Sequence, residues 1–151
     1  MPLKEIVECV PNFSEGKDKS VIDKICAAIK TVETVEILDI DMGSDTNRTV
    51  VTFIAESEYV GKAAFKGIEK AAELIDMSKH TGAHPRMGAT DVCPFIPVSN
   101  VSMEDCIDIA NKLGNNVGEL LKIPVFLYEM AAANEERRNL ANVRSGEYEG
   151  L

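Results

Sequence analysis

The chain has two histidines, and both lie in one short stretch that also contains glycine and proline. Gly82 lies between His80 and His84, Pro85 follows directly, and both residues favour a loop. In a loop, a spacing of four residues does not place two imidazoles on one face, and neither an HExxH pattern nor an obvious third ligand accompanies them. We therefore predict no metal site. A histidine with a pKa of about 6.5 is suited to general acid–base catalysis; the alternative is a histidine that only hydrogen-bonds within its loop.

An arginine and a group of polar residues could assist a catalytic histidine, by binding a substrate carboxylate or by orienting the imidazole. Arg86 can bind a carboxylate through two parallel hydrogen bonds, or it forms an ordinary surface ion pair. The stretch 39–48 runs from an expected strand into a loop rich in Asp, Ser, Thr and Asn. Asp39 and Asp41 would point to one side of that strand, where a carboxylate can orient a nearby histidine. The alternative for residues 45–47 is capping of a turn.

A third polar loop begins at Asn12 and ends at Gly16, directly after the first expected strand. Each of these three loops is a weak signal alone. They would become a site if the fold brought the strand ends to one edge of a sheet.

The elements that would position these loops follow from hydrophobic patterning and turn residues. We expect an α+β fold in the order β-α-β-β-α-β-α-β. Its first six elements match the split βαβ, ferredoxin-like arrangement, with helices over one sheet face, followed by an added helix and strand. The other face needs cover from the third helix or a second subunit. The expected strands are 5–10, 35–40, 49–55, 91–98 and 123–128, and the expected helices are 17–32, 57–75 and 102–121.

Local signals refine three of these elements. Ser57 is a candidate N-cap of the second helix, and Ser102 opens the third with a pattern like a capping box. Pro94 and Pro97 cannot donate to a sheet ladder, so 91–98 is expected to be an edge or irregular strand.

The composition is that of a globular domain. Of 151 residues, 45% are hydrophobic and 27% charged, which excludes a disordered chain and fits one domain over residues 1–151. The net charge of −9 argues against nonspecific nucleic-acid binding and an anionic membrane surface, because both need a cationic footprint. A local cationic pocket stays compatible with it. No stretch approaches the ~20 apolar residues of a membrane span.

Cysteine usage and the N-terminal residues bear on the compartment. Residues 1–5 show no charged segment followed by an apolar one, as a secretory signal would. The cysteines show no CxxC spacing and lie in apolar stretches, so we expect reduced, buried thiols in a cytoplasmic protein. They are Cys9, Cys26, Cys93 and Cys106.

Taken together, the polar stretches resemble the N-terminal subdomain of glutamate formimidoyltransferase (formiminotransferase). The resemblance covers residues 4–151 and implies a ferredoxin-like α/β subdomain. It also implies transfer of a formimino group from N-formimino-L-glutamate to the co-substrate tetrahydrofolate, in histidine degradation. The motifs that carry it are VECVPNFSEG (7–16), DTNRTV (45–50), LIDMSKHTGAHPRMGATDVCPFIPV (74–98) and SGEYEGL (145–151).

The resemblance assigns roles to individual residues. The histidine of its HPRMG motif is His84, which would take a proton from the attacking amine and return one to the leaving nitrogen. Asp41 would hold the imidazole or the amidinium. The substrate-binding residues would be Asn12, Asn47, Arg48 and Arg86. One departure falls in the second loop, where the family's GPSTNR is GSDTNR (43–48) here, so a proline is lost and a carboxylate gained.

Family enzymes carry a second, C-terminal subdomain after the SGEYEGL region, with folate between the two, and this chain stops at Leu151. Several arrangements are compatible with that: a separate chain that supplies the other half, a homodimer, or a cloned fragment. The alternative function is a non-catalytic module, derived from the enzyme, that binds folate or another small molecule or serves assembly. We expect folate and formiminoglutamate as ligands, and neither nucleic acid nor membrane as a partner.

Overall fold

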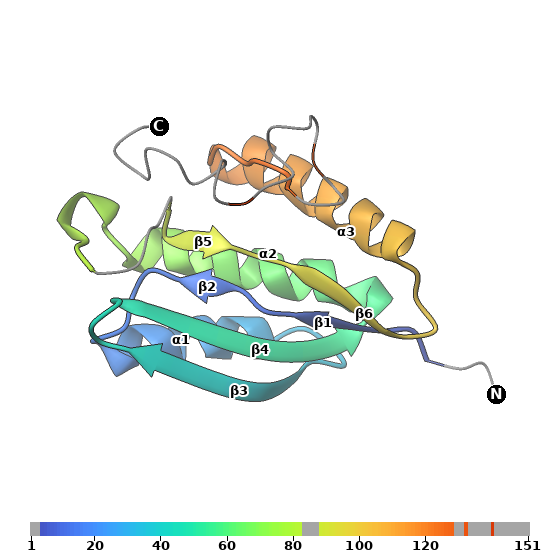
Figure 1. The fold of residues 1–151 in the computed structure, drawn as a ribbon, viewed down its shortest axis with the longest axis horizontal. Coiled ribbons are helices and arrows are strands. Elements are labelled where there is room, and N and C mark those ends of the chain that lie inside the picture. The colour runs from blue at the N-terminus through green and yellow to red at the C-terminus, as the bar shows by residue number, and fades with distance from the viewer. Residues whose placement is uncertain (1–3, 83–87, 129–131, 133–139, 141–151) are drawn as a thin grey trace.

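The computed structural model describes residues 4–82, 88–128, 132 and 140 (Figure 1). His84, Arg86 and the stretch 145–151 lie outside the described residues. Within the described part of the chain, no helix combines the length and apolar character needed to cross a membrane.

The described strands form one antiparallel sheet in which two of the strands are interrupted. β4 pairs with β3 on one side and with both β1 and β2 on the other; β1 then pairs with β6, and β2 with β5. Prolines cause the interruptions, since Pro11 separates β1 from β2 and Pro94 separates β5 from β6, and proline has no N–H for the ladder. The expected irregular strand at 91–98 is therefore confirmed. The strands are β1 (Ile6–Cys9), β2 (Asn12–Phe13), β3 (Glu36–Gly43), β4 (Arg48–Glu56), β5 (Thr90–Val92) and β6 (Phe95–Ser99).

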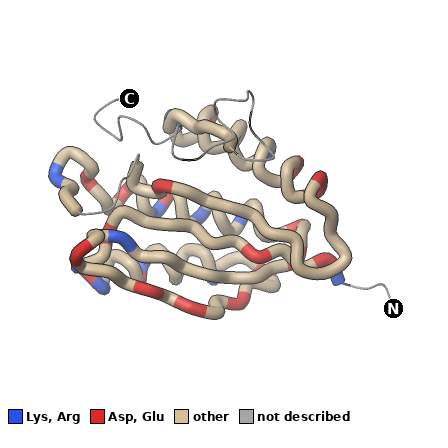
Figure 2. Tube along the Cα trace, in the orientation of Figure 1, with Lys and Arg blue, Asp and Glu red and all other residues tan. Residues whose placement is uncertain are grey.

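The two faces of the sheet differ in cover and charge. Alternate residues of β4, from Thr49 to Ala55, are buried against α1 (Lys19–Lys30) and α2 (Ser57–Leu74), which lie behind the sheet in Figure 1. The intervening β4 residues are only half-buried and define an open face. On that face Ile96 and Val98 are 41% and 56% exposed, and acidic positions follow β3 (Figure 2).

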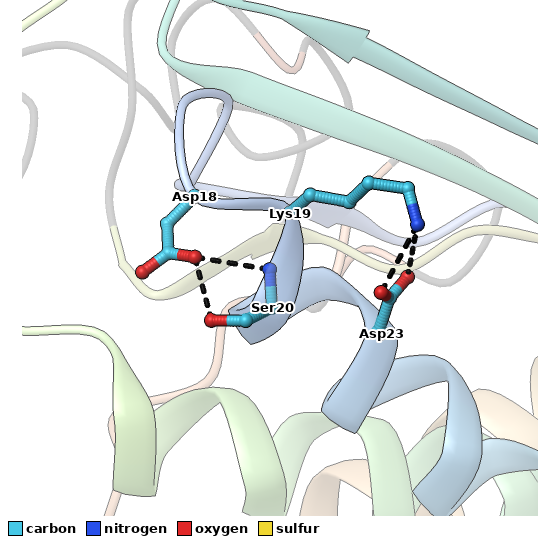
Figure 3. Close-up of polar contacts among 4 residues, drawn as sticks. All are labelled: Asp18, Lys19, Ser20 and Asp23. Atoms are coloured by element: carbon cyan, nitrogen blue, oxygen red, sulfur yellow. Dashed lines mark hydrogen bonds and ion pairs between the residues drawn. The ribbon is translucent and has the colours of Figure 1, made fainter.

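The helices begin where the sequence provides caps. The Asp18 carboxylate accepts hydrogen bonds from the backbone N–H and hydroxyl of Ser20, at 2.9 and 2.6 Å, and so caps α1 (Figure 3). In the first turn, Lys19 forms an exposed ion pair of 3.0 Å with Asp23, four residues on.

The predicted capping box at Ser102 is confirmed, whereas the predicted N-cap at Ser57 is wrong. Ser102 and Asp105 form a reciprocal capping box at the start of α3 (Met103–Asn116). Ser57 is not the N-cap of α2, because that position is Glu56 and Ser57 is the first helical residue. The Ser57 hydroxyl instead donates to the Glu5 carboxylate at 2.8 Å, which ties the helix to the chain entering β1.

The α+β prediction is confirmed, and with each interrupted strand counted once the first six elements follow the order β-α-β-β-α-β. The added helix is α3, which packs on β6 and α2. The added strand at 123–128 is wrong, because this segment has no regular structure. A π-helical turn (η2, Val117–Leu121) ends at Lys122 with a φ of 57°, and Pro124 then removes a donor. Val125 and Leu127 lie against Gly114 of α3 instead of extending the sheet.

Candidate active site

Asn47 joins the three polar loops at one end of the sheet. Its side-chain oxygen Oδ1 accepts a hydrogen bond from the backbone N–H of Gly16 at 2.9 Å. Its side-chain nitrogen Nδ2 donates to the carbonyl of Thr81 at 3.0 Å. Its own carbonyl accepts from Nε2 of His80, which is buried, at 2.9 Å. The convergence that the sequence suggested is therefore present among the described residues.

The backbone around Asn47 explains why the loops can approach so closely. Asn47 has a φ of 50°, a left-handed conformation that asparagine adopts more readily than other residues with a side chain. A Cβ atom on Gly16 would lie 2.1 Å from the Gly43 carbonyl oxygen, and one on Gly82 would lie 2.4 Å from the Thr46 carbonyl oxygen. Glycine is needed at both positions because the obstructing atoms are backbone.

The loop at residues 12–16 also binds the described residues that follow 83–87. The backbone N–H of Ser14 donates to the Ala89 carbonyl at 2.8 Å, and the Ser14 hydroxyl donates to the Gly88 carbonyl at 2.7 Å. The hydroxyl of Thr49, on the helix face of β4, donates to the Glu15 carbonyl. Segment 83–87 contains His84 and Arg86. The described residues just before it are hydrogen-bonded to Asn47, and those just after it are hydrogen-bonded to Ser14.

A cross-strand row places other predicted residues on the open face beside these loops. In register, Asp41 of β3 lies opposite Val50 of β4, which lies opposite Asn12 of β2. Directly paired residues share a face of a sheet, so Asp41 and Asn12 flank Val50 on the open face. Arg48, two residues before Val50 on β4, shares that face. Asp41 is exposed, whereas Asn12 is buried with its amide nitrogen donating to the Val10 carbonyl at 3.0 Å.

These positions divide the predicted site residues into groups. Asp41, Asn12 and Arg48 share the loop end of the open face. Asn47 lies at the same end of the sheet, directly before β4, and its amide hydrogen-bonds to the main chain of two loops, so what the structure describes is an organising role. Its role as a substrate ligand, like those of His84 and Arg86, stays a prediction. Among the described residues, no cluster of three or more His, Cys, Asp and Glu side chains is arranged to hold a metal ion.

Sequence reasoning considered His80 only as a metal ligand or a loop residue, and the structure assigns it a definite contact with Asn47. The turn that carries it is η1 (Met77–Lys79), capped by Asp76. The hydroxyl and backbone N–H of Ser78 donate to that carboxylate and lower the pKa of Asp76 below its usual value. The D-x-S pattern at 76–78, which repeats that at 18–20, is the sequence signal that could have revealed this fixed turn.

Comparison with known proteins agrees with the resemblance. A glutamate formimidoyltransferase from Streptococcus pyogenes serotype M1 is 44% identical over 149 residues, which are 99% of this chain and 50% of that protein. One from Thermoplasma acidophilum is 49% identical over 144 residues, 95% of this chain and 48% of that protein. A formimidoyltransferase-cyclodeaminase from Gallus gallus is 51% identical over 149 residues, 99% of this chain and 28% of that protein.

The chain therefore spans about half of the two glutamate formimidoyltransferases and a smaller share of the cyclodeaminase-containing relative. The family model of the formiminotransferase domain, N-terminal subdomain, matches residues 6–151, nearly the whole sequence. The chain belongs to the family of formiminotransferase N-terminal subdomains.

Proposed function

We propose that this chain provides one half of a formimidoyltransferase site, which moves a formimino group from N-formimino-L-glutamate to tetrahydrofolate as co-substrate. The observation that supports the proposal is the gathering of Asp41, Asn12 and Arg48 on one open face, beside loops that Asn47 ties together. The described residues that flank the segment with His84 are hydrogen-bonded to Asn47 on one side and to Ser14 on the other. The names of the relatives agree with this reaction type.

The residue types fit the bonds that must change. The N5 nitrogen of tetrahydrofolate attacks the amidine carbon, and the bond from that carbon to the glutamate nitrogen then breaks. His84 takes the proton of the attacking amine and returns one to the leaving nitrogen, a role typically worth ~10²–10⁴-fold in rate. Asp41, exposed on the open face, stabilises the amidinium cation. Arg48 and Arg86 bind carboxylates of the substrates, against the overall negative charge of the chain.

The exposed apolar residues of the open face support the idea that a second domain or subunit covers this site. Ile96 and Val98 are exposed on the same face as the site residues, and the relatives have about as much chain again beyond the matched half. We infer that a C-terminal-type half on a separate chain, or a second copy of this chain, covers the face and completes the folate site. We also propose a cytoplasmic location and a ferredoxin-like classification; four free cysteines and the β-α-β-β-α-β order support them.

The deciding experiment is a transferase assay of the purified chain, alone and mixed with a C-terminal half from a relative. Activity alone supports a homodimer, and activity only in the mixture supports a two-chain enzyme. His84→Ala should then lower kcat by at least about 100-fold.

Asp41→Asn tests the carboxylate, with Glu36→Gln as its matched control, because Glu36 lies on the same strand and face but at the far end of the sheet. Equal loss from both variants would contradict the assignment of Asp41. Tetrahydrofolate binding without turnover in either preparation would favour the alternative, a non-catalytic binding or assembly module.

A further inference from the structure

Two thiols from distant parts of the sequence meet in the sheet beside the site. Cys9 ends β1, and Cys93 lies between β5 and β6, 84 residues later; their sulfur atoms are 3.6 Å apart. The backbone N–H of Val10 donates to the Pro94 carbonyl at 3.2 Å, which fixes the two segments against each other. Because the two cysteines are far apart in the sequence, their contact depends on the folded sheet.

A disulfide at this position needs only a small movement. The bond length is about 2.05 Å, so the sulfurs must approach by about 1.5 Å. Cys9 is held in the ladder opposite Phe53 and Phe95, whereas Cys93 lies in the break between β5 and β6, so we expect the movement to come from Cys93. The remaining cysteines, Cys26 in α1 and Cys106 in α3, make no thiol–thiol contact within the described part of the chain.

The two thiols differ in access, which sets an order of reaction. Cys93 is half-buried and lines a cavity of about 690 Å³ between the β5–β6 edge, α3 and residues 122–128. Cys9 is fully buried, and burial, then the hydrogen bond with Cys93, raises the pKa of its thiol. A small reagent therefore meets Cys93 first, and Cys9 is the thiol beside it.

We propose that Cys9 and Cys93 are an oxidation site that closes to a disulfide when the chain meets a low-molecular-weight disulfide of the glutathione type. The Cys93 thiolate attacks one sulfur of the reagent; a Cys93–reagent bond forms, and the other half leaves as a thiolate. The Cys9 sulfur then attacks the Cys93 sulfur as its proton passes to the departing half, which leaves as a thiol. The two protein thiols lose two protons and two electrons, and the reagent's disulfide takes up both to give two reduced thiols. This site is independent of the proposed transferase activity.

The bond would cross-link the sheet next to the candidate active site. Cys9 lies three residues before Asn12, and Cys93 directly follows Val92, the register partner of Asn12. Closing a loop of this length restricts the unfolded chain, so we expect the oxidised form to melt higher by on the order of 5–10 °C.

The test uses the wild-type chain with reduced and oxidised glutathione in several ratios, followed by alkylation of free thiols and peptide mapping by mass spectrometry. We expect a Cys9–Cys93 cross-linked peptide, alkylated Cys26 and Cys106, reversal by dithiothreitol, and the higher melting temperature. Cys26→Ser and Cys106→Ser are the matched controls and should leave the cross-link unchanged.

Cys9→Ala should stop the reaction at a mixed disulfide between Cys93 and glutathione. The wild-type map decides the proposal even if that variant does not fold. A wild-type map with only mixed disulfides, with no oxidation, or with bonds to Cys26 and Cys106 as frequent as the Cys9–Cys93 bond would overturn it.

Discussion

Replacing Asn47 with alanine tests whether this residue holds the three loops together. The change removes the acceptor for the Gly16 N–H and the donor to the Thr81 carbonyl, at 2.9 and 3.0 Å. Each such bond contributes about 1 kcal/mol net, and an unpaired buried donor costs at least as much. Alanine at a φ of 50° adds about 1 kcal/mol of backbone strain. We therefore expect Asn47→Ala to lower the free energy of unfolding by about 3 kcal/mol.

Two further variants separate these contributions. Asn47→Gly loses the same two hydrogen bonds but adopts a left-handed conformation freely, so it should be less destabilising than the alanine variant by about 0.5–1 kcal/mol. Asn100→Ala is the matched control, because Asn100 has the same backbone conformation, with a φ of 56°, and binds the Lys4 carbonyl away from the loops. Asn100→Ala should lower the free energy of unfolding but leave the three loops joined by Asn47 unchanged.

Urea unfolding followed by far-ultraviolet circular dichroism measures the stability of each variant, with an unchanged m-value as the check on two-state unfolding. Amide hydrogen exchange provides the local test: the Gly16 N–H should lose protection in Asn47→Ala and keep it in Asn100→Ala. If Asn47→Ala stays within about 0.5 kcal/mol of wild type and leaves Gly16 protected, Asn47 does not organise the site.

Three other predictions follow from contacts described above, two for substitutions and one for pH dependence. Gly16→Ala should destabilise by at least about 2 kcal/mol, because its Cβ would meet the Gly43 carbonyl at 2.1 Å; wild-type stability by thermal melting would contradict that packing. Ser102→Ala removes half of a capping box and should cost about 1 kcal/mol in urea unfolding, with no effect on folate binding. The pKa of Asp76 is lowered by its bonds to Ser78, so its contribution to stability is present above its usual pKa of 3.8 and is lost as pH falls through the lower folded value. A carboxyl titration by NMR that finds an ordinary pKa there would refute the cap.

Much of the fold could be predicted because local chemistry and pattern agree. The period-two burial of β4 and the apolar stripe of α1 are visible in the sequence, and the prolines explain why two strands are interrupted. The strand expected at 123–128 failed for a tertiary reason. Its apolar residues pack on α3, and nothing in a short apolar run distinguishes that from strand pairing.

The arrangement of the candidate site was harder to predict from the sequence, because it depends on main-chain contacts between loops that are distant in the sequence. Residue types indicated that Asn47 and His80 are polar loop residues, but not that the His80 ring would donate to the Asn47 carbonyl across 33 positions. Residue types identified the loops and the resemblance assigned roles within them, and the register of β3, β4 and β2 then placed Asp41 and Asn12 in one row. Neither source alone supplies both facts.

Neighbouring residues of β4 have different expected roles, because those on one face stabilise the fold and those on the other belong to the proposed site. Thr49 faces the helices, is fully buried and binds the Glu15 carbonyl, so its loss would act through folding. Arg48 and Val50, its immediate neighbours, lie on the open face among the proposed substrate-binding groups. Because strand residues alternate between faces, β4 can bind the loop at residues 12–16 through Thr49 on its buried face. The same strand carries the charge of Arg48 on its open face. Substitutions on the buried face should therefore change stability, whereas substitutions on the open face should change the proposed substrate binding and leave the core in place.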